Sequence, residues 1–188
     1  MRFTPENKSW FTALALIFLA ALARLIPHPP NFTPMTAMAL LGMAYLKPRW
    51  LAFVFPLAAL WLSNLVLDNL VYAEYYDHFM WFSNPGVFLS FLLVSMLAFW
   101  AFRQMLTAKR IALSALGASL LFWFSTNFFV WLQSGMYPKN AAGLLACYTA
   151  ALPFLRNALL GDLFFTALLF GLYALLLGKK IPAMKAKA

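Results

Sequence analysis

Six apolar runs separated by short polar breaks constrain the fold of this chain more than any other feature. They occupy residues 10–26, 34–46, 50–67, 85–102, 111–131 and 158–177. Most approach the roughly 20 residues that an α-helix needs to cross about 30 Å of hydrocarbon. With 64% hydrophobic and only 10% charged residues, the chain is not an ordinary soluble globule. The sequence predicts an all-α integral membrane protein with six transmembrane helices in a single domain, residues 1–188.

Basic residues are distributed unequally between the two sides of such a bundle. Six crossings leave only Arg24, Lys139 and Arg156 on one side. The other side receives Arg2, Lys8, Lys47, Arg49, Arg103, Lys109, Arg110, Lys179, Lys180, Lys185 and Lys187. Because cytoplasmic loops carry the excess of Lys and Arg, both termini and the basic tail 179–188 are expected in the cytoplasm. Anionic lipid beside these flanks accounts for the net charge of +9, so no nucleic-acid partner is expected.

The first apolar run also has a second interpretation. Arg2 and Lys8 precede it, and it ends in Ala21-Leu22-Ala23, a pattern found in cleaved signal peptides. Cleavage would leave five crossings, and the charge pattern alone allows both topologies. The single cysteine, Cys147, excludes an intramolecular disulfide and any CxxC motif.

Four prolines interrupt the chain between the first two runs, in the segment Pro-His-Pro-Pro-Asn-Phe-Thr-Pro at residues 27–34 (the proline segment). The next run, residues 34–46, makes a helix of only about 20 Å, which is too short to cross unaided. We therefore expect the proline segment to dip below the outer surface, where irregular backbone must be buried in protein or line a wet cavity. Residues 140–154 are also too short to span, and we expect an extra short surface or re-entrant helix there.

Small residues form a stripe along one face of the last predicted helix. They are Ala167, Gly171, Ala174 and Gly178, spaced four, three and four residues apart. Such stripes are typical of faces where two membrane helices pack closely. We expect the partner to be a helix of this chain rather than another protein.

Polar and aromatic side chains near the predicted outer ends of the helices form the candidate substrate-binding site. They are His28, Asn31, Asp68, Asn127, Trp131, Arg156, Asn157 and Asp162. A polar or charged group in a membrane bundle is costly when it faces lipid, so it normally faces a cavity or a partner. We expect these side chains to converge on one polar pocket that opens to the outside.

Each of these side chains also has a structural interpretation. The basic side chains can pair with Asp68 or Asp162. The amides can satisfy backbone groups where a helix is broken, and His28 can hold carbonyl groups of the proline segment. Trp131 can simply anchor the lipid–water boundary.

Motifs of catalysis are missing from the sequence. It contains no HExxH, no GxSxG and no P-loop. Two histidines fifty residues apart and one cysteine are weak material for a metal site. We expect no enzymatic activity, no metal and no cofactor.

The chain resembles a bacterial family of uncharacterised small membrane proteins assigned to transport. That family is related to the substrate-binding S components of energy-coupling-factor transporters. The resemblance covers nearly the whole chain and rests on these residues: Arg24 with the proline segment, Thr126-Asn127-Phe128 with Trp131, Tyr137-Pro138, Gly143, Cys147-Tyr148, Pro153-Phe154 and Gly161-Asp162-Leu163.

The resemblance implies a six-helix fold in the bacterial inner (cytoplasmic) membrane. It also implies capture of a small, vitamin-like solute from outside by the loops after the first, third and fifth helices. Many S components dock energising or coupling subunits through an AxxxA motif on the first helix, but here Ile17 and Arg24 stand four residues after Ala13 and Ala20. A solitary transporter is therefore also possible. The alternatives to transport are an accessory subunit of a larger membrane complex and, with only His28, Asp68 and Asp162 behind it, a membrane-embedded enzyme.

Overall fold

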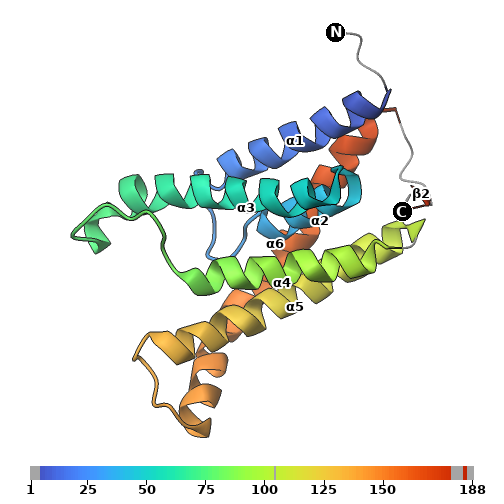
Figure 1. Ribbon diagram of the computed structural model, residues 1–188. Helices are drawn as coiled ribbons and strands as arrows, with labels where there is room; N and C mark the ends of the chain where they lie inside the picture. The colour runs from blue at the N-terminus through green and yellow to red at the C-terminus, as the bar shows by residue number, and fades with distance from the viewer. Residues whose placement is uncertain (1–4, 104, 179–183, 186–188) are drawn as a thin grey trace.

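The computed structural model describes residues 5–103, 105–178 and 184–185. The helices in this part of the chain are α1 (Pro5–Ala23), α2 (Met35–Tyr45), α3 (Arg49–Val66), α4 (Pro85–Ala101), α5 (Ala108–Gln133) and α6 (Ala141–Leu176) (Figure 1). A π-helical turn, η1 (Leu67–Val71), continues α3, and a 3-10 turn, η2 (Ala73–Tyr75), comes after it. The two-residue strands β1 (Met105–Leu106) and β2 (Met184–Lys185) pair antiparallel. The predicted helical fold class is confirmed, apart from this short pairing.

Each apolar run of the sequence lies in or largely within a helix, but the helices differ in their ability to span a membrane. Among the described residues, three are long and apolar enough: Arg49–Val71, α5 and α6. The apolar part of α1 (Asn7–Ala23), α2 and α4 are shorter. The structure therefore supports a membrane protein, while six crossings remain a prediction. The expected basic tail lies outside the described residues except for 184–185, and Arg2 also lies outside them.

The short helix α2 occupies the centre of the bundle. All residues from Met35 to Met43 are buried, and α2 contacts every other α-helix: α1, α3, α4, α5 and α6. A helix that is apolar on all sides is stable only when other elements surround it. Because its neighbours cover it, α2 does not need to reach both surfaces of a membrane.

Aromatic and hydroxyl contacts hold together the end of the bundle where α1 begins and α6 ends (Figure 1). The rings of Tyr45 and Tyr173 stack with centroids 3.7 Å apart. The Tyr173 hydroxyl also hydrogen-bonds the Ser9 hydroxyl. These contacts join α1, α2 and α6, so the first and last helices close around the central one.

Residues 140–154 do not form the separate short helix that we expected. They belong to α6, which runs without a break through Pro153. A proline inside a helix removes one backbone hydrogen bond and pushes a carbonyl aside. Two side-chain bonds are made in the turns before this position: Trp123 Nε1 of α5 donates to Ala151 O at 2.9 Å, and Thr149 Oγ1 donates to Leu145 O at 2.8 Å.

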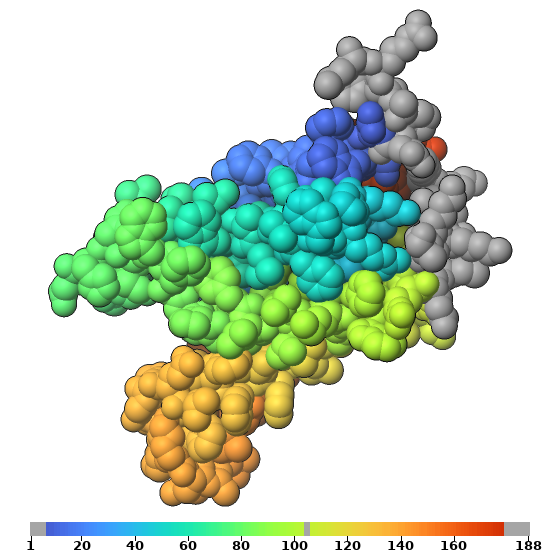
Figure 2. All heavy atoms as spheres, viewed as in Figure 1, coloured from blue at the N-terminus to red at the C-terminus, as the bar shows by residue number. Residues whose placement is uncertain are grey.

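The second half of α5 and the first half of α6 form a hairpin that projects from the rest of the bundle (Figures 1 and 2). Asn140 caps the start of α6, where its side-chain oxygen accepts a bond from Gly143 N at 2.9 Å. Trp131 Nε1 donates to Pro138 O at 2.9 Å, which closes the connecting loop. The hairpin is thus held by its own polar contacts.

The small-residue stripe on α6 does not pack closely against a helix of this chain, so that expectation is wrong. Ala167 and Gly171 are exposed, and a Cβ atom added at Gly171 or Gly178 would meet nothing within 4 Å. The close approach occurs at another glycine instead. A Cβ atom added at Gly161 would lie 2.9 Å from Phe32 Cα, because the proline segment rests on α6 there.

Candidate functional site

The proline segment lies against α6 at Pro30 and Phe32. Asn157 Nδ2 donates a hydrogen bond to Pro30 O at 3.0 Å. The Phe32 ring packs on Phe164 and Phe165, with centroids 5.7 and 5.5 Å away. Together with the close approach at Gly161, these contacts seat the segment on one face of α6, next to Asp162.

His28 and Asn31 belong to the exposed part of the segment, residues 27–31. His28 Nδ1 lies 3.2 Å from Pro29 O, and Asn31 has a left-handed backbone with φ of 63°, which asparagine tolerates better than most residues. The contact of His28 with a carbonyl group of the segment agrees with its structural interpretation. The hydrogen bond that attaches the segment to α6 comes from Asn157, which donates to Pro30 O.

Arg24 links the end of α1 to α3. Its NH1 donates to the Ser63 hydroxyl and, at 3.4 Å, to Leu60 O, while its NH2 donates to Asn64 Oδ1 at 2.8 Å. Asp68, one helical turn beyond Asn64, favours the positive charge of this guanidinium. The buried arginine thus has internal partners, but its hydrogen bonds go to a serine, an asparagine and a backbone carbonyl group, where the sequence predicted pairing with Asp68 or Asp162.

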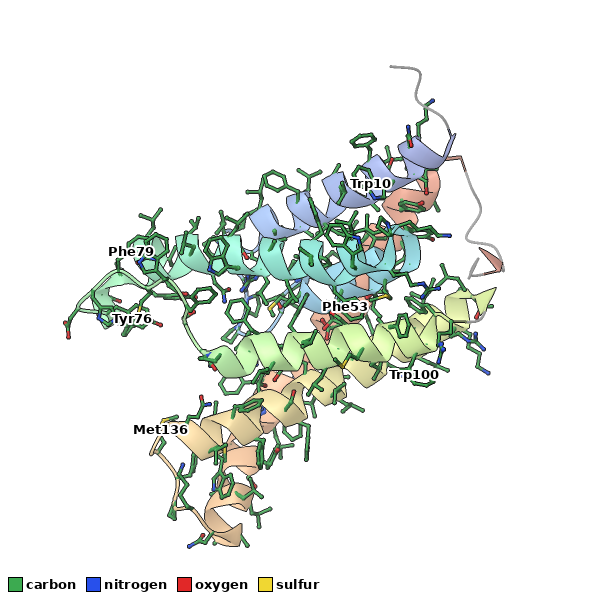
Figure 3. The ribbon with its side chains drawn as sticks, in the orientation of Figure 1. Trp10, Phe53, Tyr76, Phe79, Trp100 and Met136 are labelled. Atoms are coloured by element: carbon green, nitrogen blue, oxygen red, sulfur yellow. The ribbon has the colours of Figure 1, made fainter. Side chains whose placement is uncertain are left out.

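Asp68 lines a polar pocket at the end of the bundle away from the termini. The cavity has a volume of about 360 Å³ and is lined by Asp68, Asn69, Leu70, Ala73, Tyr76, Asp77, His78 and Phe79. Asp68 itself is only 8% exposed, and its carboxylate accepts a bond from the Ser83 hydroxyl. Figure 3 shows Tyr76 and Phe79 at this end, opposite Trp10 and Trp100.

Asn69 holds the walls of this pocket (the Asp68 pocket) together. Its Nδ2 donates to Leu65 O at 2.8 Å and to Met80 O at 2.9 Å, and its Oδ1 accepts from Met80 N at 2.8 Å. One amide side chain therefore fixes both ends of the segment between η1 and Met80.

Asp162 lies elsewhere, in the interior of the bundle about halfway along α5. Its side chain is 5% exposed and accepts a hydrogen bond from the Ser119 hydroxyl of α5. The Thr36 hydroxyl of α2 also hydrogen-bonds this carboxylate. Three helices thus contribute to one buried polar group, which we call the Asp162 centre.

Asn127 and Trp131 make their contacts within the α5–α6 hairpin. Asn127 Nδ2 donates to Trp123 O at 2.7 Å, one turn back in α5, and Asn127 O accepts from Cys147 Sγ at 3.4 Å. Trp131 closes the loop to Pro138. Asn127 is eight residues beyond Ser119, about 12 Å along the helix, so it does not join the Asp162 centre.

The expected single pocket is therefore divided among separate places. Asp68 lines one pocket and Asp162 one buried centre, while Asn157 binds the proline segment and Arg156 is exposed on α6. The hydroxyl groups of Thr36, Ser119 and Thr166 were not foreseen. The spacing of Thr166, four residues after Asp162, was the signal available, because residues four apart share a helix face.

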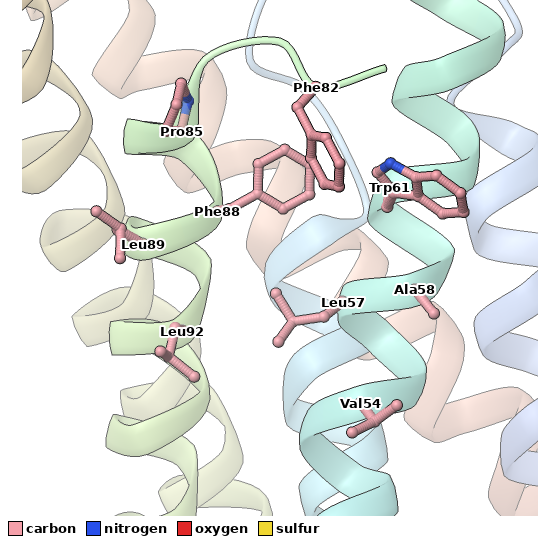
Figure 4. A pocket seen from close by; sticks show the side chains of 9 residues that line it. All are labelled: Val54, Leu57, Ala58, Trp61, Phe82, Pro85, Phe88, Leu89 and Leu92. Carbon is pink, nitrogen blue, oxygen red and sulfur yellow. The ribbon is translucent and has the colours of Figure 1, made fainter.

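A second cavity, of about 720 Å³, lies between α3 and α4 (Figure 4). It is lined by Val54, Leu57, Ala58, Trp61, Phe82, Pro85, Phe88, Leu89 and Leu92. The one polar side-chain group in this set, the Trp61 indole, donates to Trp81 O at 3.0 Å. The groove therefore offers nothing to orient a polar solute.

A metal centre was not expected from the sequence. Within the residues that the structure describes, no three His, Cys, Asp or Glu side chains are grouped closely enough to hold a metal ion together. A metal ion bound by the described residues would therefore need hydroxyl, amide or carbonyl oxygens in addition to at most two such side chains.

Comparison with known proteins assigns the chain to a family. A family of unknown function, DUF6580, matches residues 4–184, so the chain belongs to it. Neither a curated protein nor a solved structure matches the chain. The family has no established activity, and the relationship to S components stays a prediction.

Proposed function

We propose that this member of the DUF6580 family is a membrane transport protein that captures a small polar solute in the Asp68 pocket. The observation that carries the proposal is the pocket itself. Its volume of about 360 Å³ lies within the range of small-molecule sites, roughly 300–1,000 Å³. The charge asymmetry of the sequence predicts that this end of the bundle faces outward.

The lining of the pocket supports a particular class of solute. Asp68 and Asp77 supply carboxylates, Asn69 an amide, and Tyr76 and Phe79 aromatic faces. Carboxylates accept hydrogen bonds and favour positive charge, and aromatic faces attract cations. We infer a small, vitamin-like solute that carries an amine or several hydrogen-bond donors.

Binding and uptake by the purified protein test this proposal. A panel of amine-bearing vitamins and nucleobases is screened for a rise in melting temperature, and any ligand found is then offered to proteoliposomes. Asp68→Asn is expected to abolish the rise, because it removes the buried carboxylate. Glu74→Gln changes an exposed carboxylate in the adjacent turn η2 and should leave the rise intact. A panel without any binder, or equal binding by both variants, would count against the proposal.

An accessory subunit of a larger membrane complex is the second candidate, and one observation favours it. Nothing in the described part of the chain lies within 4 Å of a Cβ atom added at Gly171 in the small-residue stripe of α6, and small residues allow another membrane helix to approach closely. Co-purification of a fixed partner from native membranes, lost in Gly171→Leu, would support this role. It predicts no solute-dependent change in the melting temperature.

A further inference from the structure

The Asp162 centre has an acid but no basic partner. Among the described residues, the polar partners of its carboxylate are the hydroxyls of Ser119 and Thr36. A buried carboxylate in a membrane bundle is costly unless a positive charge or a proton accompanies it. The centre therefore needs either a proton or a small cation, and the next two observations favour the cation.

The hydrogens available at Ser119 support the same conclusion. Its Oγ lies 3.0 Å from Ala115 O and also within hydrogen-bonding distance of Asp162 Oδ2. A hydroxyl has a single hydrogen to donate. When that hydrogen goes to Ala115 O, two oxygen atoms 2.5 Å apart face each other without a hydrogen between them, and a cation bound beside both oxygens would stabilise them.

Thr166 adds an independent observation. Its hydroxyl is buried, with the residue only 3% exposed, and Oγ1 has no hydrogen-bond partner in the described part of the chain. Thr166 is four residues after Asp162 in α6, so both occupy the same helix face. An unsatisfied buried hydroxyl costs free energy unless something binds it.

We propose that Asp162, Ser119, Thr36 and Thr166 bind one sodium ion inside the bundle. The donor set consists of oxygen atoms alone, which suits a hard cation. One carboxylate balances one monovalent charge, whereas a divalent ion would leave a net charge buried in an apolar interior. The ion would tie α2, α5 and α6 together. The proposal that the sodium ion drives solute uptake rests on the proposed function. The proposal that sodium binds does not.

The test measures sodium binding by the purified full-length protein, without any solute. The melting temperature is recorded in choline chloride while NaCl or KCl replaces it at constant ionic strength, and binding of radioactive sodium is measured alongside. We expect a saturable rise in melting temperature with sodium. Thr166→Val should weaken sodium binding at least about tenfold without lowering the melting temperature in choline.

Thr149→Val is the matched control. Thr149 lies in the same helix, but it is exposed and its hydroxyl bonds only Leu145 O one turn back, so its loss should leave sodium binding unchanged. Absence of a sodium effect in the wild-type protein overturns the proposal. A melting temperature that responds to pH but not to sodium would also overturn it, because the occupant would then be a proton. A Thr166→Val variant that binds sodium as tightly as the wild-type protein would overturn it as well. Failure of solute uptake with sodium binding intact would refute only the transport proposal.

Discussion

Replacing Gly161 by alanine tests whether the proline segment is seated on α6. The added Cβ atom would lie 2.9 Å from Phe32 Cα and 3.2 Å from Phe32 C. These are backbone atoms, which cannot swing aside as the end of a side chain does, so the segment must lift from the helix. Overpacking of this kind costs about 1–3 kcal/mol. Alanine regains about 0.5–1 kcal/mol through its higher helix propensity.

Gly171→Ala provides the matched control, because it makes the same chemical change in the same helix. Nothing lies within 4 Å of its added Cβ atom, so this variant receives the propensity gain alone. The gain in helix propensity is the same in both variants, so the difference between their melting temperatures reports the steric cost at Gly161 alone. For a chain of this size, about 1–3 kcal/mol corresponds to a melting temperature of Gly161→Ala roughly 2–12 °C below that of Gly171→Ala.

Tryptophan fluorescence during heating of the detergent-solubilised protein measures both variants. Asn157→Ala adds a second reading, because it removes the bond to Pro30 O and should cost about 1 kcal/mol. Its effect should shrink in the Gly161→Ala background, where the segment has already moved. Equal melting temperatures for the two glycine variants would refute the close packing of the segment on α6.

Two further measurements check other contacts. Arg24→Lys should destabilise the protein by about 1–3 kcal/mol, since an ammonium group cannot reach Ser63, Leu60 and Asn64 together. The control is Arg156→Lys, which changes an exposed arginine and should leave the melting temperature unchanged. Equal effects of the two variants on the melting temperature would contradict the internal role of Arg24. Cys147, the single cysteine and 2% exposed, should react with a maleimide far more slowly in the native protein than after unfolding; immediate reaction would mean that the α5–α6 hairpin is not packed as described.

The helices were predictable because their signal is local. Residues 34–46 were expected to form the second helix, and α2 spans Met35–Tyr45. The expected separate helix at residues 140–154 shows the limit of such reasoning. Proline is a local stop signal, but α6 continues through Pro153, in a stretch where the Trp123 indole of α5 contacts Ala151 O, and the local sequence does not reveal such a long-range contact.

The candidate site was harder to predict for a related reason. Sequence position gives the depth of a residue along a bundle but not the direction in which its helix faces. Asp68 and Asp162 were both recognised as polar groups inside apolar helices, yet one lines the Asp68 pocket and the other meets Ser119 and Thr36. The hydroxyl partners were missed because serine and threonine also satisfy themselves within apolar helices, as Ser119 does through Ala115 O.

The proline segment gains its significance from the start of α2, which comes directly after it in the chain. Phe32, the residue that rests on Gly161, is four residues before Thr36, whose hydroxyl reaches Asp162. Phe32, which contacts α6 at Gly161, and Thr36, which contacts Asp162, therefore belong to one short stretch of chain that lies against α6. A movement that lifts Phe32 from Gly161 is therefore expected to shift the first turn of α2 and the Thr36 hydroxyl with it. The surface segment and the buried acid are connected through only four residues of chain.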